Sequence, residues 1–121
     1  MKRLAVLALL GLLSACASGA TPSQQNVVLA SKNTLVAAQT LAIQYTSLPR
    51  CGAPTAPPLC SDAGVVTSIR KANADAVVAL DAAEKVVRDP AATNSAINEA
   101  IAASTNAVTA LQTIVANHKV N

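Results

Sequence analysis

The stretch from residue 62 to residue 88, DAGVVTSIRKANADAVVALDAAEKVVR, has the most regular hydrophobic pattern in this chain. Its core positions recur at alternating steps of three and four residues, the spacing of one face of an α-helix. These positions are Val66, Ile69, Asn73, Ala76, Leu80, Ala83 and Val87. The stripe is widened by Val65, Ala72, Val77, Ala79 and Val86. Ser61 or Asp62 is the expected N-cap, so the pattern predicts a helix over about 62–88.

Asn73 is the polar exception on this stripe, and two interpretations of it remain open. A polar residue on the seam between two helices can fix their register. The alternative is a position at the edge of the seam, where the amide meets water.

Two further helices are predicted on either side of this stretch. The first covers about 22–48, because Thr21, Pro22 and Gln24 fit a capping box with proline at the first helical position, and Pro49 ends it. Its apolar face is Leu35, Ala38, Leu41, Ala42, Tyr45 and Leu48. The third covers about 91–118, with Asp89 as cap before Pro90, or with Thr93 or Ser95 as a later start. Its face is Ile97, Ile101, Ser104, Val108, Leu111, Val115 and His118.

Three amphipathic helices joined by short breaks predict an all-α fold, an up-down-up antiparallel three-helix bundle over residues 21–121. The alternative is a helical pair that completes its core by forming a small homo-oligomer. Hydrophobic residues make up 52% of the 121-residue chain but aromatic residues only 1%, so we expect a thin core and modest stability.

The first break in this pattern, LPRCGAPTAPPLCSD at residues 48–62, contains the cysteines Cys51 and Cys60. In an oxidising compartment a disulfide is their expected fate, and it would staple the first loop of the bundle. Redox-active, free or intermolecular thiols are the alternatives. The stapled loop is either a plain connection between helices or a candidate binding loop, in which the contact residues would be Arg50, Pro54, Pro57, Pro58 and Leu59.

The first fifteen residues predict a signal peptide, with Lys2 and Arg3 before an apolar run from Leu4 to Leu13. The run is too short to span a membrane. The sequence Leu13-Ser14-Ala15-Cys16 resembles the lipobox of bacterial lipoproteins. The resemblance covers only this leader. It implies cleavage before Cys16 and a diacylglycerol on the Cys16 thiol, with acyl chains such as palmitate, and makes residues 16–20 a lipid-anchored linker.

The same resemblance gives a location. In lipoproteins an Asp after the Cys favours the inner membrane, and here the residue is Ala17. The resemblance therefore implies an anchor on the periplasmic face of the outer membrane of a Gram-negative cell. The alternative is ordinary secretion with cleavage before Thr21. Either processing event leaves Cys51 and Cys60 as a pair.

The remaining composition narrows the function classes. Removing Lys2 and Arg3 leaves seven basic and six acidic residues, which is no footprint for nucleic acid. We find no nucleophile motif, phosphate loop, cofactor motif or metal-ligand spacing, and His118 lacks marked catalytic partners. We therefore expect no enzyme, cofactor or metal, but a binding or structural module of the cell envelope with an unidentified envelope partner.

The chain also shares features with two other lipoprotein classes. Prophage lipoproteins that act as lysis partners or in superinfection exclusion have a similar size, and this remains the alternative function. The major murein lipoprotein is joined to the cell wall through a terminal Lys. Here Lys119 is followed by Val120 and Asn121, which makes such a linkage doubtful.

Overall fold

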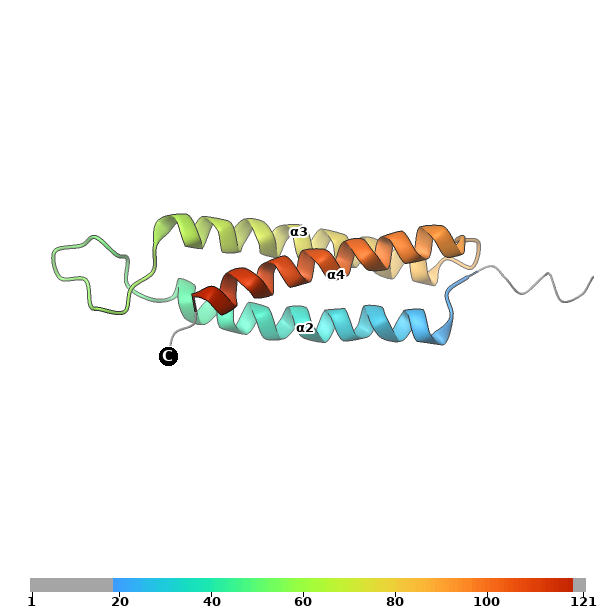
Figure 1. Ribbon diagram of the computed structural model, residues 1–121, viewed down its shortest axis with the longest axis horizontal. Coiled ribbons are helices and arrows are strands. Elements are labelled where there is room, and N and C mark those ends of the chain that lie inside the picture. The colour runs from blue at the N-terminus through green and yellow to red at the C-terminus, as the bar shows by residue number, and fades with distance from the viewer. Residues whose placement is uncertain (1–18, 119–121) are drawn as a thin grey trace, which may run out of the picture.

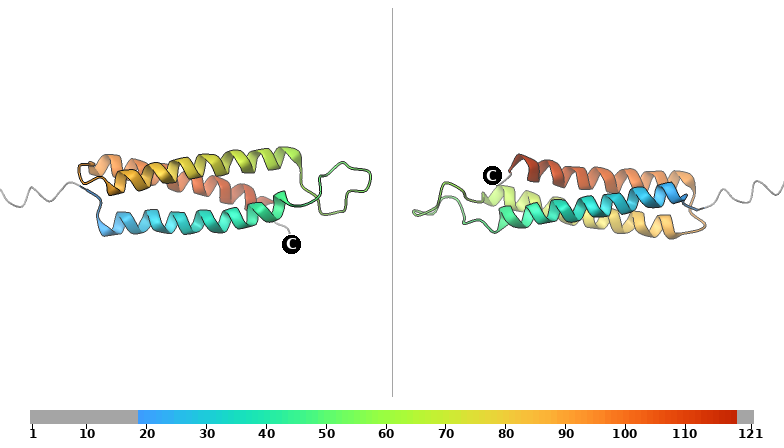
Figure 2. Two further views of the ribbon diagram at one scale, coloured as in Figure 1. Left: turned by 180° about the vertical axis from the view of Figure 1, so that it is seen from behind. Right: turned by 90° about the horizontal axis from the view of Figure 1, so that it is seen from below.

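The computed structural model describes residues 19–118, and these residues form a bundle of three long helices (Figure 1). Helix α2 covers Pro22–Thr46, α3 covers Ala63–Arg88 and α4 covers Asn94–Asn117. Helices α2 and α4 run in one direction and α3 runs in the other, as both views in Figure 2 also show. The predicted up-down-up three-helix bundle is confirmed.

The first two helices start where the sequence predicts. The Thr21 hydroxyl accepts a hydrogen bond from the Gln24 amide at 3.2 Å, and the Gln24 side chain accepts one from the Thr21 amide at 2.8 Å. This is a complete capping box. Asp62, rather than Ser61, caps α3, and its Oδ1 accepts from the amides of Gly64 at 2.8 Å and Val65 at 3.1 Å. Both caps satisfy first-turn donors that the helix itself leaves without partners.

The expected start of the third helix at residue 91 is wrong. Helix α4 begins at Asn94 with Thr93 as N-cap, which is one of the two later starts, Thr93 and Ser95, that the sequence left open. The Asp89 side chain accepts from the Ala91 amide at 2.8 Å, and the Asp89 carbonyl accepts from the Ala92 amide at 3.1 Å. Asp89 therefore closes a turn around Pro90 instead of capping a helix.

The first helix also ends two residues before the predicted Leu48. Ser47 is its C-cap. The Leu48 amide donates to the carbonyl of Tyr45, three residues earlier, at 3.2 Å, and this bond closes a final turn that is tighter than an α-helical turn. Leu48 precedes Pro49, and a residue before proline is pushed out of the helical conformation.

The core runs along the axis of the bundle and follows the predicted stripe of α3 closely. Six of its seven positions are buried, and Asn73 is half-buried. On α4, Ile97, Ser104, Val108, Leu111 and Val115 are buried. On α2 the prediction is wrong for Leu41, which is 41% exposed, and it omits the buried Val28 and Ser31. Ala76 and Ala83 of α3 and Ser104 of α4 have no exposed surface, so small side chains contribute to the core of the bundle.

Within residues 19–118 no helix is both long enough and apolar enough to cross a membrane.

Candidate functional site

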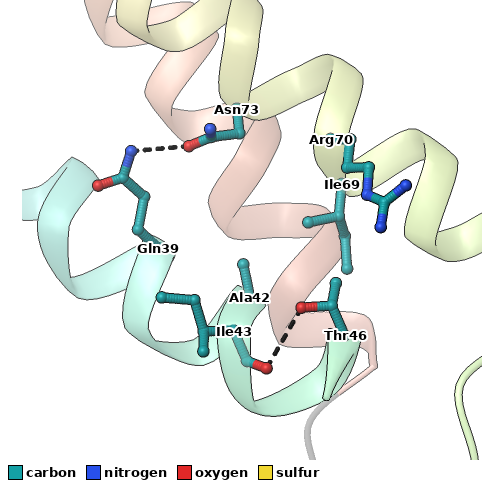
Figure 3. A pocket seen from close by; sticks show the side chains of 7 residues that line it. All are labelled: Gln39, Ala42, Ile43, Thr46, Ile69, Arg70 and Asn73. Atoms are coloured by element: carbon teal, nitrogen blue, oxygen red, sulfur yellow. Dashed lines mark hydrogen bonds between the residues drawn. The ribbon is translucent and has the colours of Figure 1, made fainter. Parts of the chain in front are cut away.

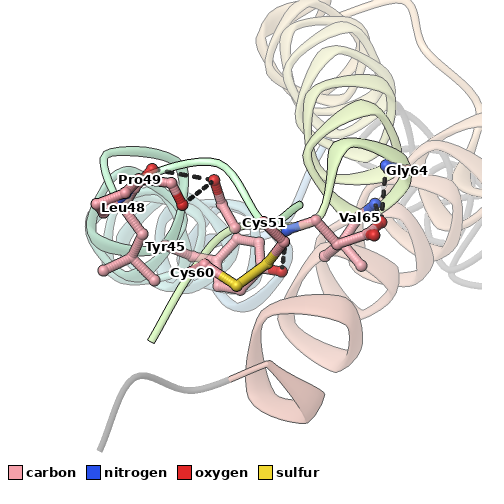
Figure 4. The surroundings of a disulfide bond; sticks show 9 residues. Tyr45, Leu48, Pro49, Cys51, Cys60, Gly64 and Val65 are labelled. Carbon is pink, nitrogen blue, oxygen red and sulfur yellow. Dashed lines mark hydrogen bonds between the residues drawn. A yellow bond between two sulfur atoms is a disulfide. The ribbon is translucent and has the colours of Figure 1, made fainter. Parts of the chain in front are cut away.

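The first candidate site is the loop between α2 and α3, at the far end of the bundle from residue 19 (Figure 1). Cys51 and Cys60 form a disulfide across it, with Cα atoms 5.0 Å apart (Figure 4). This separation is within the range that a disulfide bridges without moving the backbone. The predicted staple between the first two helices is confirmed.

We call the base of the loop, where residues 48–51 lie beside residues 60–62, the neck. It is held by hydrogen bonds as well as by the disulfide. The Ser61 amide donates to the Pro49 carbonyl at 2.8 Å, and the Cys51 amide donates to the Ser61 carbonyl at 3.0 Å. These bonds form a short parallel bridge between Arg50 and Ser61. Ser61 is 1% exposed, and its hydroxyl donates to the Leu48 carbonyl at 3.0 Å. The two chain segments of the neck are therefore fixed by several independent contacts.

Tyr45 connects the neck to the core of the bundle. Its ring is buried, and its hydroxyl accepts a hydrogen bond from the Asp62 amide at 3.0 Å, which ties the end of α2 to the start of α3. The ring of His118, the C-cap of α4, lies against it with ring centroids 5.7 Å apart. Tyr45 thus brings the ends of all three helices together. The sequence placed Tyr45 on the core face but gave no signal for this bond or for the buried Ser61 hydroxyl.

Beyond the neck the loop is open to solvent. Ala56 is half-buried and donates to the Ala53 carbonyl at 2.9 Å, which makes a turn within the loop. Gly52 has a φ of +87°, a backbone conformation that residues other than glycine rarely adopt. The five candidate binding residues are all exposed: Arg50, Pro54, Pro57, Pro58 and Leu59.

A second candidate is an open groove of about 330 Å³ between α2 and α3 (Figure 3). It is lined by Gln39, Ala42, Ile43, Thr46, Ile69, Arg70 and Asn73. The Gln39 side-chain amide donates to the Asn73 carbonyl oxygen at 2.8 Å, so Asn73 does join two helices across the seam. This contact fits the register role that the sequence left open. The groove offers apolar surface beside the Arg70 guanidinium.

The charges that connect the helices gather around Glu84. Its carboxylate accepts from the Lys32 ammonium of α2 at 2.6 Å and pairs with Arg88 at 3.2 Å. The hydrogen bond from Lys32 and the two positive charges lower the pKa of Glu84, against a smaller opposing effect of burial. On the outer face of α3, Lys71 pairs with Asp75 at 2.8 Å, and this hydrogen bond raises the pKa of Lys71.

Among the described residues, no three His, Cys, Asp or Glu side chains gather in a group able to hold a metal ion. The predicted signal peptide and lipidation residue Cys16 lie outside residues 19–118. The described chain begins at Gly19, whose amide donates to the Ala92 carbonyl at 3.2 Å. This contact places the start of the bundle beside the turn between α3 and α4.

No family model, curated protein or solved structure matches this chain.

Proposed function

We propose that this chain is a small lipid-anchored periplasmic protein that serves as a non-enzymatic binding or structural module of the cell envelope. In this proposal the acyl chains on Cys16 insert into the periplasmic leaflet of the outer membrane, and the bundle extends from it. Each buried CH₂ of such chains contributes about 0.8 kcal/mol, so several chains together give a firm anchor.

The observation that carries the proposal is the opposite placement of the two special segments. Gly19 is bonded to Ala92 in the turn between α3 and α4. This turn lies at one end of the bundle, and the Cys51–Cys60 loop between α2 and α3 lies at the other (Figures 1 and 2). The 25 residues of α2 between them span about 37 Å at 1.5 Å per residue. An anchor at Cys16 would therefore hold the bundle at the membrane and present the loop to the periplasm.

The construction of the loop supports a role in binding. Its neck is closed by the disulfide and by the Ser61 hydrogen bonds, while Arg50 and Leu59 are exposed. Three prolines restrict the backbone between the cysteines. A loop restricted in this way loses less conformational entropy on binding a partner than a flexible loop would.

The anchor is tested by fractionating cells that produce the Cys16→Ala variant. The proposal expects wild-type protein with the outer membrane and the variant in the soluble periplasm. A variant that still fractionates with the outer membrane would refute the anchor.

The binding role is tested by replacing Leu59 with a photo-crosslinking amino acid in intact cells. Val78 is the matched control, because it is also an exposed aliphatic residue but lies on α3, outside the loop. A discrete protein captured from position 59 and not from position 78 would support the binding loop. Equal capture at both positions, or none, would leave the loop as a plain connection between helices.

A further inference from the structure

Exposed apolar side chains are concentrated on one helix. Within residues 19–118, five of the seven large hydrophobic residues that are well exposed belong to α2, and Leu59 and Val78 are the other two. Three of the five are more than half exposed: Leu29 at 56%, Val36 at 57% and Ile43 at 67%. The outer surface of α2 therefore differs from the charged outer surface of α3, which carries Lys71 and Asp75.

Leu29, Val36 and Ile43 are spaced by seven residues. Seven residues are close to two helical turns, with a drift of only about 20° per repeat, so the three side chains form a line along α2. We call this line the α2 stripe. At 1.5 Å per residue it is about 21 Å long. This spacing is that of one of the two core positions in the heptad of a helix–helix seam.

Helix α2 itself carries almost no charge, although two cations of α3 border its stripe: Arg70 lines the same groove as Ile43, and Arg88 lines the same groove as Leu29. Lys32 is the single charged residue of α2, and its ammonium is already paired with Glu84 of the same chain. Asn26, Asn33 and Thr40 run beside the stripe at the same seven-residue spacing, and all three are exposed. An amide both donates and accepts hydrogen bonds, so an Asn can pair with an identical Asn. The stripe itself is therefore uncharged, and the Asn residues beside it can pair with the same residues of a second copy of this chain.

We propose that the α2 stripe is the contact surface for a second copy of this chain, with the two α2 helices parallel and in register about a two-fold axis. Leu29, Val36 and Ile43 of one copy then meet the same residues of the other. Asn33 meets Asn33 at the seam, where a polar pair fixes register and limits the assembly to two helices. The parallel direction rests on the proposed anchor at Cys16, because copies held in one membrane leaflet share one orientation.

The size of this contact determines where the dimer forms. The stripe contributes only three large apolar side chains per copy, whereas stable interfaces bury roughly 1,200 Å² or more, so we expect the copies to associate weakly in dilute solution. Helix α2 starts a few residues after Cys16, and anchoring in one leaflet raises the local concentration of the copies. The dimer is therefore expected in the membrane.

The test is cysteine crosslinking in intact cells with a short bismaleimide reagent. In a parallel pair Leu29 meets Leu29, whereas in an antiparallel pair centred on Val36 it meets Ile43. Leu29→Cys is therefore expected to give at least fivefold more covalent dimer than Val78→Cys, a matched control on α3 with 69% exposure. Adding Val36→Lys to Leu29→Cys places two positive charges at the centre of the seam and is expected to lower the dimer yield at least fivefold.

Equal yields from Leu29→Cys and Val78→Cys would overturn the proposal, and so would a product whose mass is not twice that of the chain. A dimer yield unchanged by Val36→Lys would also overturn it. Circular dichroism checks that this variant folds, and if it does not, the comparison between positions 29 and 78 still decides. Fractionation of the same cells shows separately whether the protein is held in the outer membrane. Failure of the proposed anchor is therefore distinguishable from failure of the proposed dimer.

Discussion

Removing the disulfide should destabilise the bundle without changing its fold. The change is the double substitution Cys51→Ser and Cys60→Ser, which avoids leaving one free thiol. The cysteines are nine residues apart, and the chain-entropy model then gives a loss of about 2.6 kcal/mol. A domain of this size typically has a net stability of 5 to 15 kcal/mol, so this loss is a large fraction of the total.

The structure explains why this loss should arise mainly in the unfolded state. The amides of Ser61 and Cys51 bridge the neck whether or not the sulfur atoms are joined. The folded neck therefore persists in the variant, while the unfolded chain gains the freedom that the disulfide removed. With an unfolding entropy of about 0.21 kcal/mol/K for 100 residues, the expected fall in Tm is about 12 °C.

The assay is thermal and urea unfolding followed by circular dichroism, with Cys16→Ala in both proteins to remove the proposed lipid. Reduction of the parent protein should reproduce the unfolding curve of the double variant, and this is the control. A Tm within about 2 °C of the parent would refute the entropic argument. Loss of helical signal at 20 °C would show that the neck depends on the disulfide for its structure.

Three further changes test particular contacts, each by urea unfolding. Tyr45→Phe removes the acceptor for the Asp62 amide at 3.0 Å and should cost about 1 to 2 kcal/mol; an unchanged midpoint would contradict the role of Tyr45 in the neck. Leu111→Ala, at a position with no exposed surface, should cost about 2 to 5 kcal/mol, whereas Leu41→Ala, at 41% exposure, should cost less than about 1 kcal/mol; equal costs would refute the assigned core. Glu84→Gln should destabilise the protein by up to about 1 kcal/mol at pH 7. Because the folded pKa of Glu84 lies below its usual 4.5, its contribution is present above pH 4.5 and is lost as the pH falls through the lowered pKa, so the variant and the parent should converge in acid. A difference that persists there would contradict the ion pair with Lys32.

The regular parts of the fold followed from the sequence where one pattern had no competitor. The core positions of α3 recur at steps of three and four residues. Its buried residues Ile69, Leu80 and Val87 lie where this pattern places them. Helix α2 is apolar on several faces, so its own sequence does not determine which face is buried. Its partner helices decide, and they cover Val28 and Ser31 while leaving Leu41 exposed.

The details of the site depended on competition between local hydrogen bonds. Ser61 and Asp62 are both good caps, and only the folded neck assigns the cap to Asp62 and the carbonyl contact to Ser61. Asp89 likewise suits both a helix cap and a turn, and its bond to Ala91 selects the turn. The disulfide was more predictable, because Cys51 and Cys60 are close in sequence and both lie in the proline-rich break between two predicted helices.

The measurement that tests the central proposal most directly is mass spectrometry of the N-terminal peptide of the protein purified from membranes. The proposal predicts that the mature chain begins at Cys16, and that this residue carries a diacylglyceryl group on its sulfur. A peptide that begins at Thr21 without lipid, or one that retains the first fifteen residues, would contradict the lipid-anchored bundle.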